Sequence, residues 1–439
     1  MRKFFLPFAL FACFASAYAQ TPQLPKRNCA SNELYLQQLK DDPEFARNQK
    51  QIELFTEEFI RKGGAASLDK TQAGTPIYTI PVVVHVVYKT TAQNITTAQV
   101  QSQIDVLNKD YQKLNADVSK VPSIWTSLVA DCQIKFCLAT IDPSGLTTTG
   151  IVRKSTTKTS FSTNNDVKFT SRGGDNAWPA GSYLNLWVCN LGGGILGYAQ
   201  FPGGAASTDG VVIDNNAFGS TGTVSYPYNL GRTATHEIGH WLNLRHIWGD
   251  DGTACTGSDL VTDTPNQAGE HYGCPVFPQV TCSNGPNGDM FMNYMDYTDD
   301  RCMYMLTNGQ KTRIYGVLQT GGARHSVTIS GKCGPQPPFV SSGIITATNA
   351  KALLNVIPNP VVSGTPAVSY KLMAAANTQL TVSDIYGSFV KNINIGNQAA
   401  GTYQLHPAEL GRLENGIYLL KLVSANGGIL ASTRFIVSK

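Results

Sequence analysis

The sequence predicts an α+β protein: a helical N-terminal segment, a central domain of mixed sheet and helices, and a C-terminal β-sandwich. Three observations predict this class. Charged, helix-prone residues fill 32–62, the β-branched apolar run YTIPVVVHVVY begins at Tyr78, and short alternating segments separated by turns follow Leu353. A chain of 439 residues is long enough for two or three domains.

The N-terminus has the form of a secretory signal peptide, residues 1–19. A basic pair, Arg2 and Lys3, precedes an apolar stretch, and the small-x-small site Ala17-Tyr18-Ala19 ends it. A lipid-attachment cysteine at Cys13 is the alternative, although the bulky Phe11 fits that pattern poorly. No later apolar run is long enough for a transmembrane segment.

Composition shifts divide the rest of the chain. We expect a pro-segment at 20–74, a central domain at 75–333, a Pro/Gly/Ser-rich linker at 334–352 and a C-terminal domain at 353–439. Hydrophobic residues make up 42% of the chain and charged residues only 15%, as in exported, loop-rich globular proteins. The formal net charge of +4 is small for this length, so no nucleic-acid partner is expected.

The central domain contains the stretch HEIGHWLNLRH, residues 236–246. His236 and His240 are four residues apart, so on a helix they share one face and can bind the same metal ion. Glu237 lies beside them and can take a proton from a water on that ion. With His246 as third ligand and a water as fourth, the set is typical of a catalytic zinc site.

His246 can join this set only if the helix ends early. On a continuing helix it would lie about 9 Å beyond His240, out of reach of the same ion. Asn243 occurs where the chain must bend back, and asparagine is the best substitute for glycine at positive φ. We therefore predict a positive φ at Asn243, at the end of the helix.

Other interpretations of the motif exist. HExxH alone is often only a helix surface, although a third histidine at this spacing makes that interpretation weak. A non-catalytic surface or binding module could hold zinc structurally, but structural sites use four protein ligands and would leave Glu237 without a role. An exopeptidase would need a charged pocket for a chain terminus, which the sequence does not reveal.

The motif resembles the HExxHxxGxxH of the metzincin metalloproteases, with Asn243 in place of glycine. NYMDY at 293–297 resembles their Met-turn, which implies that Met295 lies beneath the zinc and that Tyr297 stabilises the oxyanion. GYAQFPGG, DGVVID, DLVTDTPNQ and FMNYMDYTDDRCMYMLTNGQ are similar to the pappalysins. This resemblance implies a two-lobed catalytic domain in which the strand at 196–201 pairs with an extended peptide substrate.

Cysteines flank the long loop that follows the zinc motif: Cys255, Cys274, Cys282 and Cys302. Spacing alone allows three pairings. The resemblance to pappalysins implies Cys255–Cys282 and Cys274–Cys302. The pairing of four others stays open: Cys132, Cys137, Cys189 and Cys333.

Cys29 lies in the pro-segment, in KRNCAS. Pappalysin-like zymogens carry an Arg-x-Cys-Gly stretch whose thiolate takes the fourth zinc position, and Arg27-Asn28-Cys29-Ala30 departs from it only at the glycine. The resemblance therefore implies that Cys29 is a zymogen switch, since a soft thiolate binds zinc well. An ordinary disulfide is the alternative. Arg61, Lys62 and Lys70 are candidate activation sites.

Two further sites are expected in the region after the zinc motif. GSDLVTDTP offers hard oxygen ligands from Asp259, Thr262, Asp263 and Thr264, which suit calcium, although an Asx-turn without an ion would use the same residues. Some pappalysin-like enzymes cut beside arginine, using an acidic residue just before the last cysteine. Here that position is Arg301, which predicts a specificity pocket that prefers acidic side chains; the nearby Asp299 and Asp300 leave the choice open.

The C-terminal segment VIPNPVVSG…GIYLLKLV…FIVSK resembles the sorting domain of type IX secretion. This resemblance implies passage through the bacterial outer membrane by its secretion machinery, followed by release or surface attachment. A carbohydrate-binding or adhesive module is the alternative. The whole sequence thus predicts a secreted zinc endopeptidase, made as a latent zymogen, in which Glu237 activates a zinc-bound water to hydrolyse protein or peptide substrates.

Overall fold

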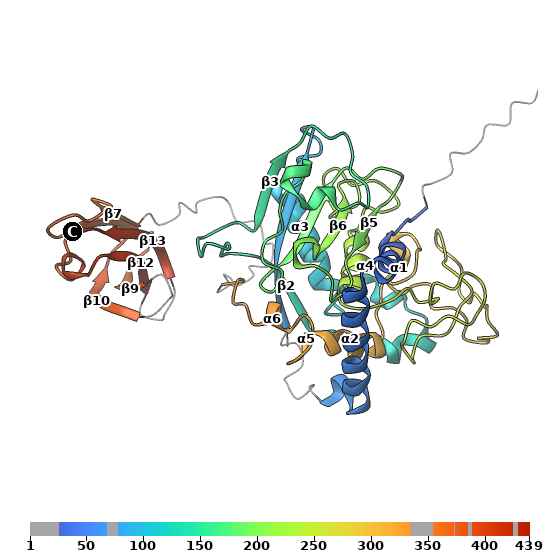
Figure 1. The fold of residues 1–439 in the computed structure, drawn as a ribbon. Helices are drawn as coiled ribbons and strands as arrows, with labels where there is room; N and C mark the ends of the chain where they lie inside the picture. The colour runs from blue at the N-terminus through green and yellow to red at the C-terminus, as the bar shows by residue number, and fades with distance from the viewer. Residues whose placement is uncertain (1–25, 68–77, 335–353, 373, 385–388, 425–428) are drawn as a thin grey trace, which may run out of the picture. The chain divides into compact units, whose positions relative to one another are not determined.

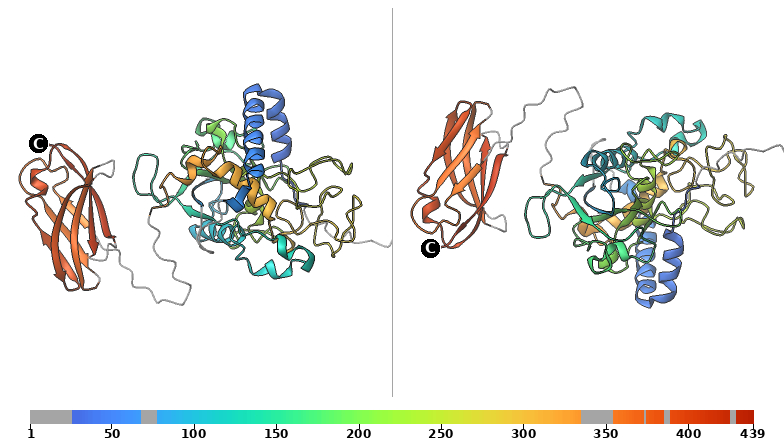
Figure 2. Two further views of the ribbon diagram at one scale, coloured as in Figure 1. Left: turned by 90° about the horizontal axis from the view of Figure 1, so that it is seen from below. Right: turned by 90° about the horizontal axis from the view of Figure 1, so that it is seen from above.

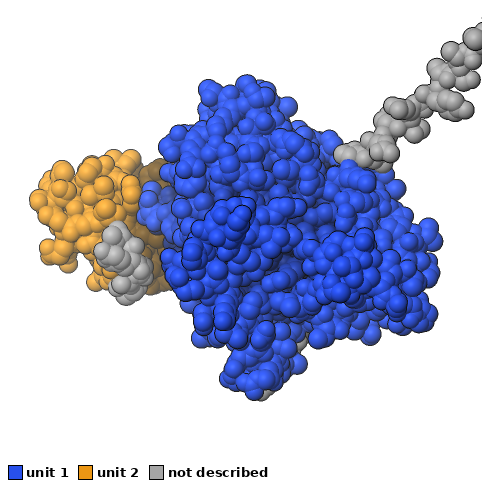
Figure 3. Space-filling model, turned by 45° about the vertical axis from the view of Figure 1, so that its right-hand side comes forward, with its two compact units in different colours: residues 1–336 blue, residues 337–439 orange. Residues whose placement is uncertain are grey.

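The computed structural model describes residues 26–67, 78–334, 354–372, 374–384, 389–424 and 429–439. The chain divides into two compact units, residues 1–336 and residues 337–439, which Figure 3 colours blue and orange. The predicted signal peptide, Lys70 and nearly all of the predicted linker lie outside the described residues. Among the described residues, no helix is long and apolar enough to cross a membrane.

The first unit contains both helices and strands (Figure 1). Its α-helices are α1 (Ser31–Asp41), α2 (Pro43–Arg61), α3 (Thr97–Asp110), α4 (Arg232–Trp241), α5 (Asn308–Leu318) and α6 (His325–Thr328). Its strands are β1 (Tyr78–Tyr88), β2 (Ile134–Leu138), β3 (Ile151–Ser155), β4 (Leu184–Cys189), β5 (Gly197–Ala199) and β6 (Val211–Asp214). The predicted α+β class is confirmed.

These six strands form one mixed sheet in the order β2-β1-β4-β6-β5, with β3 also paired to β1. Every pairing is parallel except that of β5 with β6. β1 pairs on both sides, which explains its unbroken run of buried β-branched residues. The antiparallel β5 lies at the edge of the sheet, where an extended segment can pair with its outer main-chain groups.

The main core lies between the sheet and the helices. Every second residue of β1 from Ile80 to Val86 points to the same side of the sheet. These side chains belong to one apolar cluster with Ile104 of α3 and with Ile238 and Trp241 of α4. All ten residues of α4 are buried. The sheet and α3 therefore hold α4, the helix with the histidine motif, in the centre of the unit.

The N-terminal helices pack onto this core from outside. Asp42 ends α1 and caps α2, because its carboxylate accepts hydrogen bonds from the main-chain N–H groups of Glu44 (2.9 Å) and Phe45 (3.1 Å). Figure 2 shows α1 and α2 side by side. α2 also packs on α5, where a Cβ on Gly316 would come within 2.8 Å of the Thr56 methyl group.

The second unit consists of two antiparallel sheets around one apolar core. Its strands are β7 (Leu354–Ile357), β8 (Ala367–Leu372), β9 (Ala376–Asp384), β10 (Phe389–Gln398), β11 (Gly401–Leu405), β12 (Gly416–Ser424) and β13 (Ile429–Val437). One sheet has the order β10-β9-β12-β13 and the other β11-β8-β7. Both sheets contribute to the core, Val368 from β8 and Leu380 from β9 among others, as in the predicted β-sandwich.

Candidate active site

The histidine helix ends in a sharp bend. α4 stops at Trp241, and Asn243 has a φ of 74°, so the predicted positive φ is confirmed. The N–H of Leu244 then bonds back to the carbonyl of Gly239 at 2.9 Å, closing the end of the helix. The bend returns the chain toward α4 and brings His246 to the two helical histidines.

The three imidazoles converge on one point. The Nε2 atom of His240 lies 3.2 Å from that of His236 and 3.1 Å from that of His246. Zinc bound at about 2.0–2.1 Å to tetrahedral nitrogen ligands separates them by about 3.3–3.4 Å, close to this spacing.

The opposite ring nitrogens fix the tautomers. The Nδ1–H groups donate to the Tyr294 carbonyl (2.7 Å, from His236), the Leu244 carbonyl (2.9 Å, from His240) and an Asp250 carboxylate oxygen (2.6 Å, from His246). All three Nε2 atoms therefore present lone pairs to one another, which only a cation can relieve. This donor set fits zinc.

Cys29 of the pro-segment completes the set. One ligand atom from each of Cys29, His236, His240 and His246 lies within 4.8 Å of every other, and all four residues are buried. Burial and the neighbouring Glu237 raise the pKa of the Cys29 thiol, whereas burial lowers those of His236 and His240. A thiol and three imidazoles gathered in one buried cluster form a site for a soft divalent cation.

Glu237 is fully buried beside this cluster. Burial raises the pKa of its carboxyl group to about 7. Its Oε2 accepts hydrogen bonds from the Ser31 hydroxyl (2.7 Å) and the Cys29 thiol (3.3 Å). Its Oε1 has no partner within the part of the chain that the structure describes, so this oxygen is available to a water.

The segment 293–297 lies against the histidine helix. Met295 is fully buried, and a Cβ on Gly239 would come within 2.4 Å of its sulfur, so the glycine is needed for this approach. The Tyr297 hydroxyl lies 3.2 Å from His246 Nε2 and donates to the Cys29 carbonyl at 3.3 Å. Met295 thus supports the site, and Tyr297 reaches into it.

Arg27 fills a buried pocket next to the metal cluster. Its guanidinium donates to Asp300 Oδ1 at 2.6 Å, to Thr233 Oγ1 at 3.2 Å and to the Thr298 carbonyl at 3.3 Å, and it lies 4.9 Å from the centre of the Tyr228 ring. Asp300 is fully buried, so its carboxylate forms the charged floor of this pocket.

Arg301, predicted to line the specificity pocket, does not line the pocket that holds Arg27. The Arg301 side chain is 56% exposed and lies over Tyr226, with its centre of charge 5.5 Å from that ring. The short 3₁₀ turn Asp300–Cys302 directs neighbouring side chains to opposite sides. Asp300 therefore points into the pocket, and Arg301 points to solvent.

The pro-segment enters the site as an extended strand. Ala30 donates its N–H to the Gly197 carbonyl at 3.2 Å, and Leu196 donates to the Asn28 carbonyl at 2.9 Å. Cys29 therefore pairs in parallel with β5, at the edge predicted to bind substrate. Ala30 has a φ of −99°, so no glycine is required at this position.

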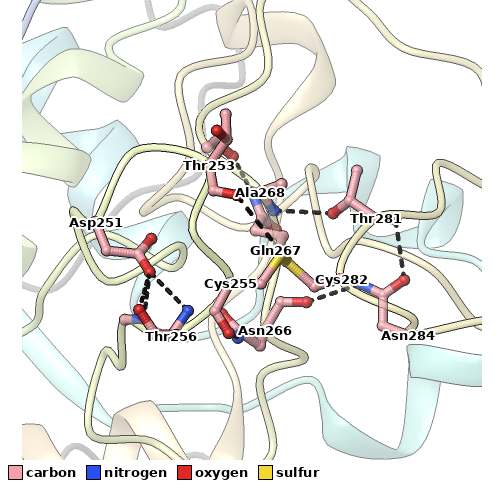
Figure 4. The surroundings of a disulfide bond; sticks show 12 residues. Asp251, Thr253, Cys255, Thr256, Asn266, Gln267, Ala268, Thr281, Cys282 and Asn284 are labelled. Atoms are coloured by element: carbon pink, nitrogen blue, oxygen red, sulfur yellow. Dashed lines mark hydrogen bonds between the residues drawn. A yellow bond between two sulfur atoms is a disulfide. The ribbon is translucent and has the colours of Figure 1, made fainter.

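The long loop after the motif has neither helix nor strand from Gly249 to Asp299 among its described residues. Disulfides Cys255–Cys282 and Cys274–Cys302 cross-link it. Figure 4 shows the first of these among side chains that bond the loop to itself, including Asn284 to the Asn266 carbonyl at 2.8 Å. A third disulfide joins Cys137 to Cys333, and the free cysteines of the described residues are Cys29, Cys132 and Cys189.

The expected calcium ligands are only partly gathered. Asp259 accepts from the Thr264 hydroxyl at 2.8 Å, and that hydroxyl also lies 3.1 Å from the Val261 carbonyl. Burial raises the pKa of Asp259 to about 7. Asp263 instead accepts from Thr307 and Gly309 at the start of α5, and Thr262 is exposed. Calcium at Asp259 stays a prediction.

Sequence reasoning missed two residues of the site. Ser31 bonds Glu237 but carries no local signal, because it lies 206 positions away. Asp250, which orients His246, could have been found from its i+4 spacing.

Known proteins share these features. Residues 168–319 match the peptidase M43 family, described as pregnancy-associated plasma protein-A, and residues 355–438 match the secretion system C-terminal sorting domain. An extracellular metalloprotease of Arthroderma otae is 32% identical over 278 residues, which cover 62% of this chain and 87% of that protein.

Two solved structures of mirolysin from Tannerella forsythia are also similar. The mature protein in complex with a cleaved peptide is 51% identical, with a TM-score of 0.59, and the match covers 61% of this chain and all of that one (100%). A promirolysin mutant is 46% identical, with a TM-score of 0.62, and the match covers 69% of this chain and 97% of that one.

Proposed function

Because this chain belongs to the peptidase M43 family of metalloproteases, we propose that the three histidines and Glu237 form its hydrolytic centre. The protein is an extracellular zinc metalloprotease in zymogen form, secreted through a type IX sorting domain. The observation that carries the proposal is the convergence of three Nε2 lone pairs beside a buried carboxylate.

His236, His240 and His246 would hold the zinc. When bound, zinc supplies a Lewis acid that polarises a water and the substrate carbonyl. Glu237 takes the proton of the attacking water at Oε1, its unpaired oxygen, and delivers it to the leaving amine.

Tyr297 would stabilise the developing oxyanion. Its hydroxyl already donates to a main-chain carbonyl, that of Cys29, beside His246. A substrate carbonyl at the same place would receive the same hydrogen bond, strengthened as negative charge develops on the oxygen.

Cys29 would keep the enzyme latent by taking the fourth zinc position. Its thiol excludes water from the side of the cluster that the histidines leave open. We assign residues 26–67 to the described part of the pro-segment, and exposed Arg61 and Lys62 at the end of α2 remain the accessible candidate cuts.

The arginine pocket indicates the cleavage preference. Arg27 pairs with Asp300 and both side chains are buried, and a substrate arginine would make the same bonds once the pro-segment leaves. We therefore propose cleavage beside arginine, and lysine to a lesser extent, in place of the acidic preference expected from Arg301.

The remaining assignments follow the domain boundaries predicted from the sequence. The catalytic domain would span 75–333, and the β-sandwich from 353 would engage the outer-membrane secretion machinery. Calcium would bind at Asp259, Thr264 and the Val261 carbonyl, whose oxygens lie together.

The test is digestion of a reduced, alkylated protein by the activated wild type and by Glu237→Ala, with and without a chelator. Glu237→Ala should retain zinc, measured by metal analysis, and lose at least about 1000-fold in kcat, as expected on loss of an essential base. Equal cleavage by both proteins would refute the proposal. A non-catalytic zinc module predicts no cleavage by either.

A further inference from the structure

Tyr35 of α1 lies against Phe201 of the catalytic domain, at a place that we call the Phe201 position. Its ring lies 4.6 Å from the ring of Phe201, which follows β5, and 5.9 Å from that of Phe45 in α2. These rings form a separate small apolar cluster, in which Phe201 is the only fully buried member that the catalytic domain contributes among the described residues. Removal of the pro-segment would therefore expose Phe201.

The side chain of Arg245 also contacts Tyr35 at this position. The Arg245 guanidinium lies 5.5 Å from the centre of the Tyr35 ring and donates to the Tyr35 hydroxyl at 3.3 Å. Phe201 thus provides an apolar face, and Arg245 provides both a cation for the ring and a donor for its hydroxyl. This combination matches a tyrosine side chain better than an aliphatic one.

The position is close to the metal cluster. The Phe201 ring lies 5.4 Å from the ring of His240. Tyr35 is therefore within about 10 Å of a metal ligand, a distance that an extended peptide covers in about three residues. A substrate held at the metal can reach it.

The pro-segment also shows on which side this position lies. Arg27 precedes Cys29, which is at the metal, and Tyr35 follows it. Cys29 pairs in parallel with Gly197, and Phe201 lies four residues beyond Gly197, so the chain after β5 runs toward the Phe201 position and away from the pocket of Arg27. The two positions therefore lie on opposite sides of the metal along the bound segment. A peptide that fills the arginine pocket would present its other side to Phe201 and Arg245.

We propose that Phe201 and Arg245 form a second specificity subsite, which takes an aromatic side chain, tyrosine above phenylalanine, across the scissile bond from arginine. This inference rests on the proposed function, because the subsite opens only when the pro-segment leaves. It predicts a two-part substrate preference, arginine on one side and an aromatic residue within three positions on the other.

The experiment uses activated full-length enzyme and quenched-fluorescent peptides with one fixed arginine. Tyrosine, phenylalanine, leucine or alanine is placed in turn at each of the three positions across the scissile bond. At one of them, kcat/KM should be about tenfold higher for tyrosine than for alanine, as expected from burial of an aromatic ring. The readout is this ratio, which is independent of the overall activity of each variant.

Variants separate the two contributions. Phe201→Ala should reduce the ratio of tyrosine to alanine peptides to about twofold or less. Arg245→Met should abolish the advantage of tyrosine over phenylalanine while keeping the aromatic preference. Arg172→Met, at an exposed arginine paired with Asp166, is the matched control and should change neither ratio.

A flat profile at all three positions, or a tyrosine preference that Phe201→Ala leaves intact, would overturn the subsite. Either result would leave chelator-sensitive cleavage beside arginine in place. Loss of the proposed function would instead appear as no cleavage of any peptide, or as cleavage that Glu237→Ala retains.

Discussion

The Ser31 hydroxyl donates a 2.7 Å hydrogen bond to Glu237, and it accepts one at 2.8 Å from the N–H of Ala199 in β5. Both side chains are fully buried. Ser31 thus connects the catalytic carboxylate to the strand predicted to bind substrate. The pro-segment therefore occupies the base and the metal cluster together, two residues apart in its sequence.

We expect Ser31→Ala to weaken latency. A hydrogen bond to a buried carboxylate contributes about 1.5–3 kcal/mol, so activation should accelerate by about tenfold or more. The measurement is the appearance of peptidase activity with time in purified zymogen. Ser119→Ala, at an exposed serine whose hydroxyl donates to the Ala116 carbonyl, should activate at the wild-type rate. An equal rate for Ser31→Ala would contradict the prediction.

Cys29→Ala should have a larger effect than Ser31→Ala, because it opens the fourth position of the zinc site. We expect spontaneous activation during purification, scored by the loss of residues 20–74 on mass spectrometry. Cys132→Ala is the matched control, since Cys132 is also a buried free cysteine but lies outside the metal cluster. A latent Cys29→Ala protein would exclude the zymogen switch.

Asp300→Asn should reduce kcat/KM for peptides with arginine by at least about 100-fold, because it leaves a buried guanidinium without a charged partner. The asparagine keeps an oxygen for the main-chain N–H groups of Leu230 and Arg232, which now bond Asp300 Oδ2 at 2.8 and 3.2 Å. Arg301→Ala should leave the same constant within about twofold, as for most exposed side chains. The reverse pattern would restore the prediction from the sequence.

The pH dependence of the free energy of unfolding should reveal how much His271 stabilises the protein. Burial alone would lower its pKa, but hydrogen bonds to Asp289 and Asp296 outweigh burial and raise the pKa from 6.5 to about 9. The stabilisation is complete below pH 6.5 and is lost as the pH rises through about 9.

Urea unfolding of wild type and His271→Gln, followed by tryptophan fluorescence, measures this contribution. All five tryptophans lie in the first unit, so the signal reports on the domain that contains His271. His271→Gln should cost about 2 kcal/mol at pH 6 and much less at pH 10. A difference independent of pH would show that packing, not charge, gives His271 its effect.

Calcium should raise the melting temperature of the wild type through Asp259, because an ion that binds only the folded state stabilises it. Asp259→Asn should abolish this shift. Asp263→Asn should lower the melting temperature with or without calcium, because Asp263 bonds the start of α5. Identical calcium shifts in wild type and Asp259→Asn would place the ion elsewhere.

Local chemistry made part of the site predictable. The i+4 spacing of His236 and His240 and the need for positive φ at Asn243 depend on a few neighbouring residues, and the structure has both features. The alternating segments after Leu353 form two sheets for the same reason, because side-chain period follows from strand geometry.

Contacts between residues far apart in the sequence were harder to predict. Arg27 and Asp300 are 273 positions apart, and Cys137 and Cys333 are 196 apart, so only the folded chain brings them together. The choice between Asp300 and Arg301 depended on which side chain a single turn buries. No pattern in the sequence predicts which of these two side chains points inward.

The closely spaced contacts of Arg27, Cys29 and Ser31 have a consequence for how the enzyme switches on. A cut after Arg61 would end the covalent tether but would leave these contacts and α1 in place. The pro-segment would then be a separate inhibitor. The fraction of enzyme that it inhibits would depend on its free concentration, because no linker would keep it near the site. Activation should therefore be faster in dilute solution than in a confined space such as the periplasm, because dilution prevents rebinding.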